Sequence, residues 1–230
     1  MRRLFRLAAL LSFAAFLAVS FAGIRELHGA YRLHKRLEHI AGEAGTGEMR
    51  WHCLQRVNPD LQCLLVWEGL LDLPVVQTDN NSFYLDHAFD GSAATYGTAF
   101  LDAACSRDDA GVMILGHHVF DDREAVFSPL MRLYESEPPE EITLQYEDCT
   151  YAYTFLGAAE ADDEAILDLD PVRKTCDKAG IGRLSRFLRT GFLPYTGVLQ
   201  ETDRFLILQT CTDPQGDRKL LVFARLESIR

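Results

Sequence analysis

The sequence predicts a mainly β fold with helical additions, closed or nearly closed into a barrel and preceded by an N-terminal transmembrane helix. Short apolar or alternating segments, separated by turn residues, run through most of the chain. Only two later stretches have helical spacing, and many short strands with few helices are typical of barrels. An uncharged run follows a basic N-terminus. We therefore expect one globular domain behind a membrane segment.

Residues 1–24 predict a membrane anchor with a short basic cytoplasmic start. Three arginines within the first six residues precede an uncharged run from Leu7 to Ile24. Eighteen helical residues span about 27 Å, enough to cross the hydrocarbon core of a bilayer. The positive flank should stay in the cytoplasm, which places the rest of the chain outside the cell. A cleaved signal peptide is the alternative, with small residues at Ser20 and Ala22, and it would also export the domain.

Residues 25–47 predict a stalk helix and a linker. The segment Arg25–Ala41 is charged and helix-prone, and the glycines of Gly42–Gly47 break it. The globular domain is therefore expected over residues 48–230.

Strand and helix patterns then follow along the domain. The helical patterns cover Arg123–Tyr134, where Pro129 argues against a straight helix, and Gly182–Thr190. The strand patterns, recognised by apolar or alternating residues, are Leu61–Trp67, Leu73–Gln77, Ser82–Leu85, Thr98–Leu101, Val112–Leu115, Glu141–Gln145, Tyr151–Leu156, Phe205–Gln209 and Leu220–Ala224.

Composition excludes some functions. The chain is 230 residues long and 48% hydrophobic, which supports a real core. Its net charge of −11 argues against nucleic acid as a partner, because a phosphate binder needs a basic face. Acidic residues gather in Glu135–Asp148 and Glu160–Asp170, and we interpret both clusters as solvated surface.

The six cysteines form no C-x-x-C pair, so structural zinc is not favoured. Export would permit disulfides, and Cys53 could pair with Cys63, although nothing in the spacing demands it. We expect most of the six to be small core residues.

Three chemistry-bearing side chains stand at strand ends. Cys211 ends the apolar run that begins at Phe205, His117 follows an apolar run and Gly116, and a cation opens the last strand. A thiol, an imidazole and a fixed cation are the parts of a cysteine acyl-transfer site. Such a site needs no cofactor or metal.

Each of these residues also has a plainer interpretation. Cys211 could be a core thiol, and Arg218 an edge-strand charge that discourages aggregation. His117 could be a surface histidine; a metal role is disfavoured because His117-His118 lacks a third ligand.

Several segments together resemble a class B sortase, over roughly residues 49–226. They occur in the family's order and are Val57–Leu61, Leu73–Gln77, Asn80–His87, Gly97–Asp102, Ile114–Asp122, Met131–Tyr134 and Leu206–Cys211.

The resemblance implies a barrel of about eight strands and a membrane-bound transpeptidase on the cell surface. Such an enzyme cleaves a C-terminal sorting motif after threonine, holds the acyl group as a thioester, and transfers it to an amine of peptidoglycan or of a pilin. Class B members favour an Asn-Pro-x-Thr type of motif. They carry a helix between the sixth and seventh strands, a place that Ile181–Thr190 fits.

Residue by residue, the family's nucleophile matches Cys211 and its general acid/base matches His117, with His118 expected on the opposite side of the strand end. The family's arginine falls on Lys219 by counting from the last strand and on Arg218 by side chain. We favour Arg218 as the oxyanion and substrate stabiliser, because only a guanidinium offers a planar fork, with Lys219 as the runner-up.

One departure concerns Gln209, which stands where many members of the family carry a serine. Two alternative functions stay open. The same site could serve a cysteine hydrolase, with water in place of the amine. The chain could also be a non-catalytic module that only binds sorting peptides.

Overall fold

The computed structural model describes residues 47–174 and 176–230. The predicted membrane anchor and all of the predicted stalk except residue 47 lie outside the described residues. Within the described part, no helix is both long enough and apolar enough to cross a bilayer. The elements are α2 (Gly47–Val57), β1 (Leu61–Trp67), β2 (Leu71–Val76), the 3₁₀ helix η1 (Phe83–Leu85), β3 (Phe100–Leu101), β4 (Gly111–Leu115), the 3₁₀ helix η2 (Ser128–Tyr134), β5 (Glu141–Gln145), β6 (Thr150–Ala161), α3 (Asp163–Lys174), α4 (Lys178–Arg189), β7 (Phe205–Cys211) and β8 (Lys219–Ile229).

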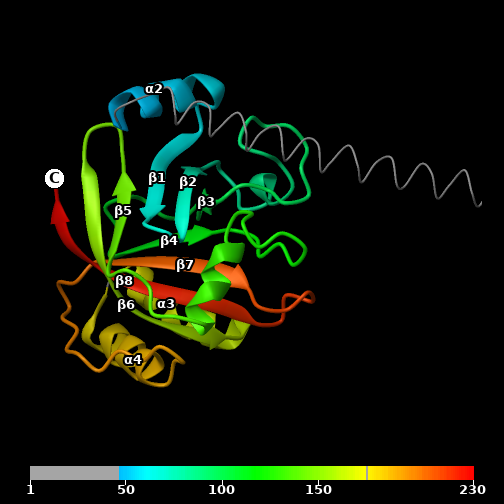
Figure 1. The fold of residues 1–230 in the computed structure, drawn as a ribbon. Helices are drawn as coiled ribbons and strands as arrows, with labels where there is room; N and C mark the ends of the chain where they lie inside the picture. The colour runs from blue at the N-terminus through cyan, green and yellow to red at the C-terminus, as the bar shows by residue number, and fades with distance from the viewer. Residues whose placement is uncertain (1–46, 175) are drawn as a thin grey trace, which may run out of the picture.

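The strands close into a barrel in the order β1-β2-β3-β4-β7-β8-β6-β5 (Figure 1). The predicted closed barrel with helical additions is therefore confirmed. Neighbouring strands are antiparallel except at two places, β2 with β3 and β4 with β7. A barrel of this kind leaves no long unpaired edge open to aggregation.

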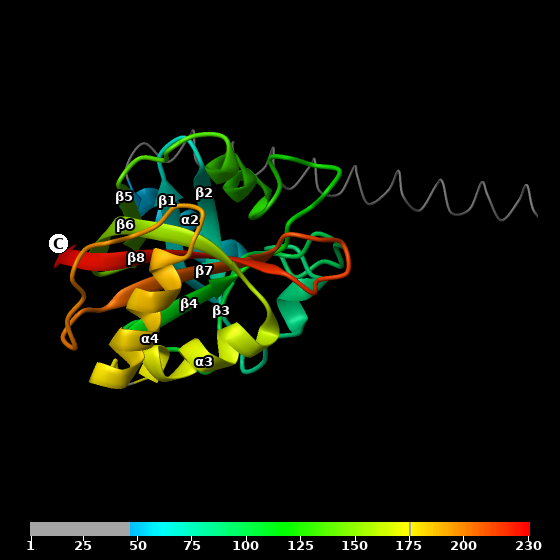
Figure 2. The same ribbon diagram turned by 90° about the horizontal axis from the view of Figure 1, so that it is seen from below.

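The β4–β7 connection holds much of the remaining chain. Parallel neighbours cannot be joined by a hairpin, so the chain must cross over between them. Here the crossover contains β5, β6, α3 and α4, and the two helices lie together on one side of the barrel (Figure 2). Because both strands run the same way, their carboxyl ends meet at one end of the barrel.

The main core consists of strand residues together with residues of η2, α3 and α4 that pack against them. Strand β7 is buried from Phe205 to Leu208, with Leu206 and Leu208 fully inaccessible. A smaller cluster outside the barrel joins Trp51 and Leu54 of α2 to aromatic residues near η1. This second cluster fixes α2 and the η1 segment to the barrel.

Two predicted elements differ from the structure, and two helices were not predicted. Ser82–Leu85, expected as a strand, contains the helix η1, because the Asn80 side chain accepts hydrogen bonds from the backbone of Ser82 and Phe83 and forms a turn. The expected helix Arg123–Tyr134 is helical only over η2, where Pro129 stands in the first turn. Helices α2 and α3 were not predicted.

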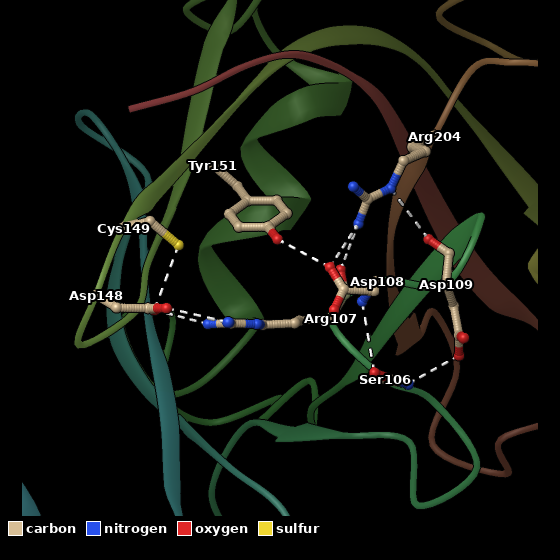
Figure 3. Close-up of polar contacts among 8 residues, drawn as sticks. All are labelled: Ser106, Arg107, Asp108, Asp109, Asp148, Cys149, Tyr151 and Arg204. Atoms are coloured by element: carbon tan, nitrogen blue, oxygen red, sulfur yellow. Dashed lines mark hydrogen bonds and ion pairs between the residues drawn. The ribbon is translucent and has the colours of Figure 1, made fainter.

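A polar network closes the other end of the barrel (Figure 3). Arg107 donates two hydrogen bonds to Asp148, at 2.6 and 3.0 Å, and links the loop before β4 to the β5–β6 turn. Arg204, directly before β7, donates to the Arg107 carbonyl at 2.6 Å, and Tyr151 donates to Asp108 at 3.1 Å. A polar groove of about 710 Å³, lined in part by Arg107 and Asp148, lies there.

The packing of β7 gives a stability prediction. Leu208→Ala should lower the free energy of unfolding by about 2–5 kcal/mol, because the side chain is fully buried and its removal leaves a cavity. Leu167→Ala, whose side chain is 73% exposed on α3, is the matched control and should change it by less than about 0.5 kcal/mol. Chemical denaturation measures both. An equal loss in the two variants would contradict the described burial of β7.

Candidate active site

The β4–β7 ladder brings the predicted histidine and the predicted nucleophile to the same end of the barrel. Leu115 pairs with Gln209, and the Gly116 N–H continues the ladder by donating to the Gln209 carbonyl at 3.1 Å. Two residues further along the chain stand His117, just beyond the end of β4, and Cys211, the last residue of β7. Because side chains alternate along a strand, Cys211 belongs to the same face of β7 as Gln209. The fold therefore brings these two residues to the same strand ends.

Gly116 is required by the packing directly before His117. A Cβ atom at this position would lie 2.8 Å from the Phe127 ring, so a larger residue would displace either strand or ring. The chain then returns on itself, with the Phe127 N–H donating to the His117 carbonyl at 3.0 Å. Val126 adopts a φ of 47°, a conformation that costs a β-branched residue about 1–3 kcal/mol. The backbone at His117 is thus held in place by the packing of Gly116 and by the hydrogen bond from Phe127.

The ring of His117 is oriented by the η1 segment. Its Nε2 lies 2.9 Å from the Leu85 carbonyl oxygen. A carbonyl only accepts hydrogen bonds, so Nε2 carries the hydrogen in the neutral ring and Nδ1 is left as the basic nitrogen. A buried asparagine anchors this segment, because Asn58 donates to Tyr84 Oη at 2.7 Å and to the Phe89 carbonyl at 2.6 Å.

His118 contacts the nucleophile through the backbone. Its Nδ1 lies 3.2 Å from the Cys211 carbonyl oxygen, and its ring packs against the exposed Phe120 at a tilt of 39°, with centroids 4.0 Å apart. Burial lowers the pKa of His118, although the hydrogen bond to the Cys211 carbonyl opposes this. His118 is therefore neutral near pH 7 and holds the strand end rather than adding charge.

Cys211 ends β7 with a partly buried thiol. Burial raises its pKa, Lys219 lowers it, and Asp213 and Asp163 raise it further. The net direction is upward, so desolvation and the two carboxylates outweigh the one cation. At neutral pH the residue is a thiol that needs a base before it can attack.

Lys219 is the cation that faces Cys211. The two residues are direct partners in the antiparallel β7–β8 ladder, which places their side chains on one face. The Lys219 side chain is only 15% exposed, and its Nζ donates to Asp163 Oδ1 at 2.9 Å and to the Gly216 carbonyl. The ammonium is therefore held next to the β7–β8 loop.

Arg218, which the sequence favoured, points elsewhere. It precedes Lys219 by one residue, so its side chain belongs to the opposite face. Its guanidinium lies 2.7 Å from Glu160, which also accepts from Tyr134 Oη at 2.7 Å, and the side chain is 62% exposed. In this structure Arg218 is thus bound to Glu160 rather than directed at Cys211.

Asp213 organises the loop between β7 and β8. Its carboxylate accepts from the backbone N–H groups of Gly216, Asp217 and Arg218, at 2.6, 3.1 and 2.8 Å. Burial alone would raise the pKa of this carboxyl, but these backbone donors hold it below its usual range. The loop places Gly216 so close to the nucleophile that an added Cβ would lie 3.7 Å from Cys211 Sγ.

The other predicted features are less connected to this site. Cys63 and Cys176 are buried thiols, as expected for core residues, and Cys53 forms no disulfide with Cys63. Among the described residues, no group of three or more His, Cys, Asp and Glu side chains could hold a metal ion. The helix α4 overlaps the predicted Gly182–Thr190 and lies between β6 and β7.

The raised pKa of Cys211 gives a pH prediction. Only the thiolate reacts with iodoacetamide, so the rate should rise about tenfold per pH unit up to a midpoint above that of an ordinary cysteine. Peptide mass spectrometry of the Cys211 adduct measures the rate apart from Cys53 and Cys149, and Cys211→Ser is the control. A rate that is already constant below pH 7 would show a stabilised thiolate and contradict the prediction.

Comparisons with known proteins identify the fold. No family model matches the chain, and no curated protein matches it by sequence. Solved sortase B structures do match. A mutant form of sortase B from Clostridium perfringens superposes with a TM-score of 0.72 at 21% identity, over 86% of this chain and 98% of that one.

Two further structures agree with this match. A Staphylococcus aureus sortase B–substrate complex gives a TM-score of 0.69 at 19% identity, over 86% of this chain and 94% of that one. A sortase B from B. anthracis gives 0.69 at 15% identity, over 88% and 98%. Over most of its length, the chain therefore shares the fold of the sortase B structures.

Proposed function

We propose that the protein is a cell-surface cysteine transpeptidase that cleaves a C-terminal sorting motif after threonine and transfers the new carboxyl end to an amine. The observation that carries the proposal is that His117 follows the end of β4 by two residues, while Cys211 ends β7, the parallel neighbour of β4. The fold shared with sortase B structures supports it. So does the shielded cation opposite the thiol.

The proposed reaction has two halves. His117 Nδ1 takes the thiol proton while Cys211 Sγ attacks the threonine carbonyl carbon, and the C–N bond then breaks as His117 protonates the leaving amine. A thioester remains on Cys211. The acceptor amine attacks this thioester, and His117 removes the amine proton. The C–S bond breaks, His117 passes that proton to the departing sulfur, and the enzyme returns to its starting state.

The oxyanion of each tetrahedral intermediate needs a positive or hydrogen-bonding partner. We assign this role to Lys219, because it shares the face of Cys211, and not to Arg218, which binds Glu160. An ammonium gives a point charge without the planar fork of a guanidinium. The assignment follows the count from the last strand rather than the choice by side chain.

The substrate, acceptor and location belong to the proposal as well. One solved sortase B is a complex with a substrate and another is a complex with triglycine. By likeness, we propose an Asn-Pro-x-Thr type of motif as donor and an amine of peptidoglycan or a pilin as acceptor. The basic start and apolar run over residues 1–24 support a single-pass anchor, with the catalytic domain outside the cell.

The covalent intermediate provides the main test. Incubation with a panel of sorting-motif peptides should give an acyl adduct on Cys211, located by mass spectrometry. Cys211→Ala should abolish it, and His117→Ala should slow its formation at least about 100-fold, because general acid–base catalysis is lost. His118→Ala is the matched control. Loss of activity in His118→Ala with full activity in His117→Ala would reverse the assignment of the base.

The products separate the alternatives. Transfer to triglycine is expected when the amine is abundant. Release of free acid under the same conditions would favour the hydrolase, whereas peptide binding without any adduct would favour a non-catalytic module.

The choice of cation has its own test. Lys219→Gln should lower kcat/KM about 100-fold or more, because one oxyanion partner is lost, whereas Arg218→Gln should lower it less than about fivefold. Lys219→Arg should restore part of the activity by keeping the charge. A larger loss in Arg218→Gln than in Lys219→Gln would return the role to Arg218. Circular dichroism checks that each variant is folded.

A further inference from the structure

Helix α3 reaches the candidate site through its first residue. It begins at Asp163, two residues after Ala161, the last residue of β6, and Ala161 pairs with Lys219. The Asp163 carboxylate lies 2.9 Å from Lys219 Nζ, although its own side chain is 81% exposed. An exposed carboxylate on the crossover segment thus holds the shielded ammonium that faces the nucleophile.

We propose that Asp163 is a positioning residue that fixes the Lys219 ammonium beside Cys211 and offsets part of its charge. The inference rests on the proposed function, because it assigns the control of that same site to α3.

The geometry gives Lys219 two anchors of different strength. One is the neutral carbonyl of Gly216 in the β7–β8 loop, and the other is the charged carboxylate of Asp163. A lysine side chain is flexible, so the loss of the charged anchor would release its Nζ from a single geometry. The ammonium makes both hydrogen bonds charge-assisted, but only the contact with Asp163 is also an ion pair, so we take Asp163 as the anchor that decides the position of the ammonium.

The neighbouring acid cannot replace it. Asp213 also faces the nucleophile, but its carboxylate oxygens accept from the backbone of the β7–β8 loop. The charged groups that act on Cys211 are Lys219 from β8, Asp213 from the loop and Asp163 from α3, and the ring of His118 contacts its carbonyl. Of these, Asp163 alone belongs to the crossover segment.

Two effects on the thiol follow from this arrangement. Asp163 opposes Lys219, and its own charge raises the pKa of Cys211. A shift of the α3 N-terminus away from Lys219 would therefore lower the pKa of the thiol and free the ammonium at the same time. The crossover helix would then set both the acidity of the nucleophile and the place of the cation.

The test uses Asp163→Asn in the full-length protein, with Glu164→Gln as the matched control. Glu164 is the adjacent exposed carboxylate in the first turn of α3, and its change alters the net charge equally without removing the Lys219 contact. Asp163→Asn should speed iodoacetamide modification of Cys211 at pH 7.5 about threefold, because the thiol pKa falls, and Glu164→Gln should leave the rate unchanged.

Turnover provides the second readout. Asp163→Asn should lower kcat for peptide transfer about tenfold with little change in KM, because the oxyanion partner is misplaced although the peptide still binds. In a Lys219→Gln background the same change should have almost no effect on kcat, since the residue it positions is gone.

The outcomes separate this inference from the proposed function. Alkylation of Cys211 needs no peptide, so it can be measured apart from transfer. A changed alkylation rate in Asp163→Asn together with an inactive wild type would contradict the transpeptidase function and still support the electrostatic effect of Asp163 on Cys211. Equal alkylation rates in Asp163→Asn and Glu164→Gln would overturn the inference. An equal loss of kcat with and without Lys219 would overturn it as well.

Discussion

The parallel pairing of β4 with β7 is the constraint on which the candidate site depends. Parallel neighbours must be joined by a crossover, and their carboxyl ends lie at the same end of the barrel. In this chain one of these ends leads into Gly116 and His117, and the other is Cys211. The crossover that the pairing demands contains α3, which supplies Asp163. The proposed base, the proposed nucleophile and the carboxylate that contacts Lys219 are therefore all placed by the consequences of one strand pairing.

The sequence predicted the residues whose signal is local. An apolar run that ends in cysteine or in glycine-histidine is visible in the sequence alone, so Cys211 and His117 could be proposed from it, and the strands that lead to them are confirmed. The partners of these residues could not be predicted in this way. The Leu85 carbonyl that contacts His117 is 32 residues away in sequence, and the Asp163 carboxylate that contacts Lys219 is 56 residues away. Helix α3 was missed because its acidic residues were interpreted as solvated surface.

The choice between Arg218 and Lys219 depends on the pairing of β7 with β8, which the sequence alone does not give. Arg218 and Lys219 are neighbours, and the choice between them by side chain favoured the guanidinium. In the structure the ladder pairs Cys211 with Lys219, and alternation directs Arg218 to the other face, where it forms an ion pair with Glu160. A loop of variable length hides this register from the sequence, because one residue more or less exchanges the two faces. The backbone N–H groups of Gly216 and Arg218 donate to Asp213 and hold the β7–β8 loop in one conformation. This conformation maintains the pairing of Cys211 with Lys219.

The surroundings of Cys211 favour the protonated thiol in the absence of substrate. Burial and the carboxylates of Asp213 and Asp163 outweigh the attraction of Lys219, so the resting residue is a thiol. Each unit of pKa corresponds to about 1.4 kcal/mol between the two protonation states, so a modest change in the surroundings alters the thiolate population severalfold. A thiolate is also the form that oxidises, and the proposed location outside the cell would expose the domain to an oxidising environment. A protonated thiol limits this loss, because in the proposed mechanism the reactive form arises only when His117 takes the proton during attack.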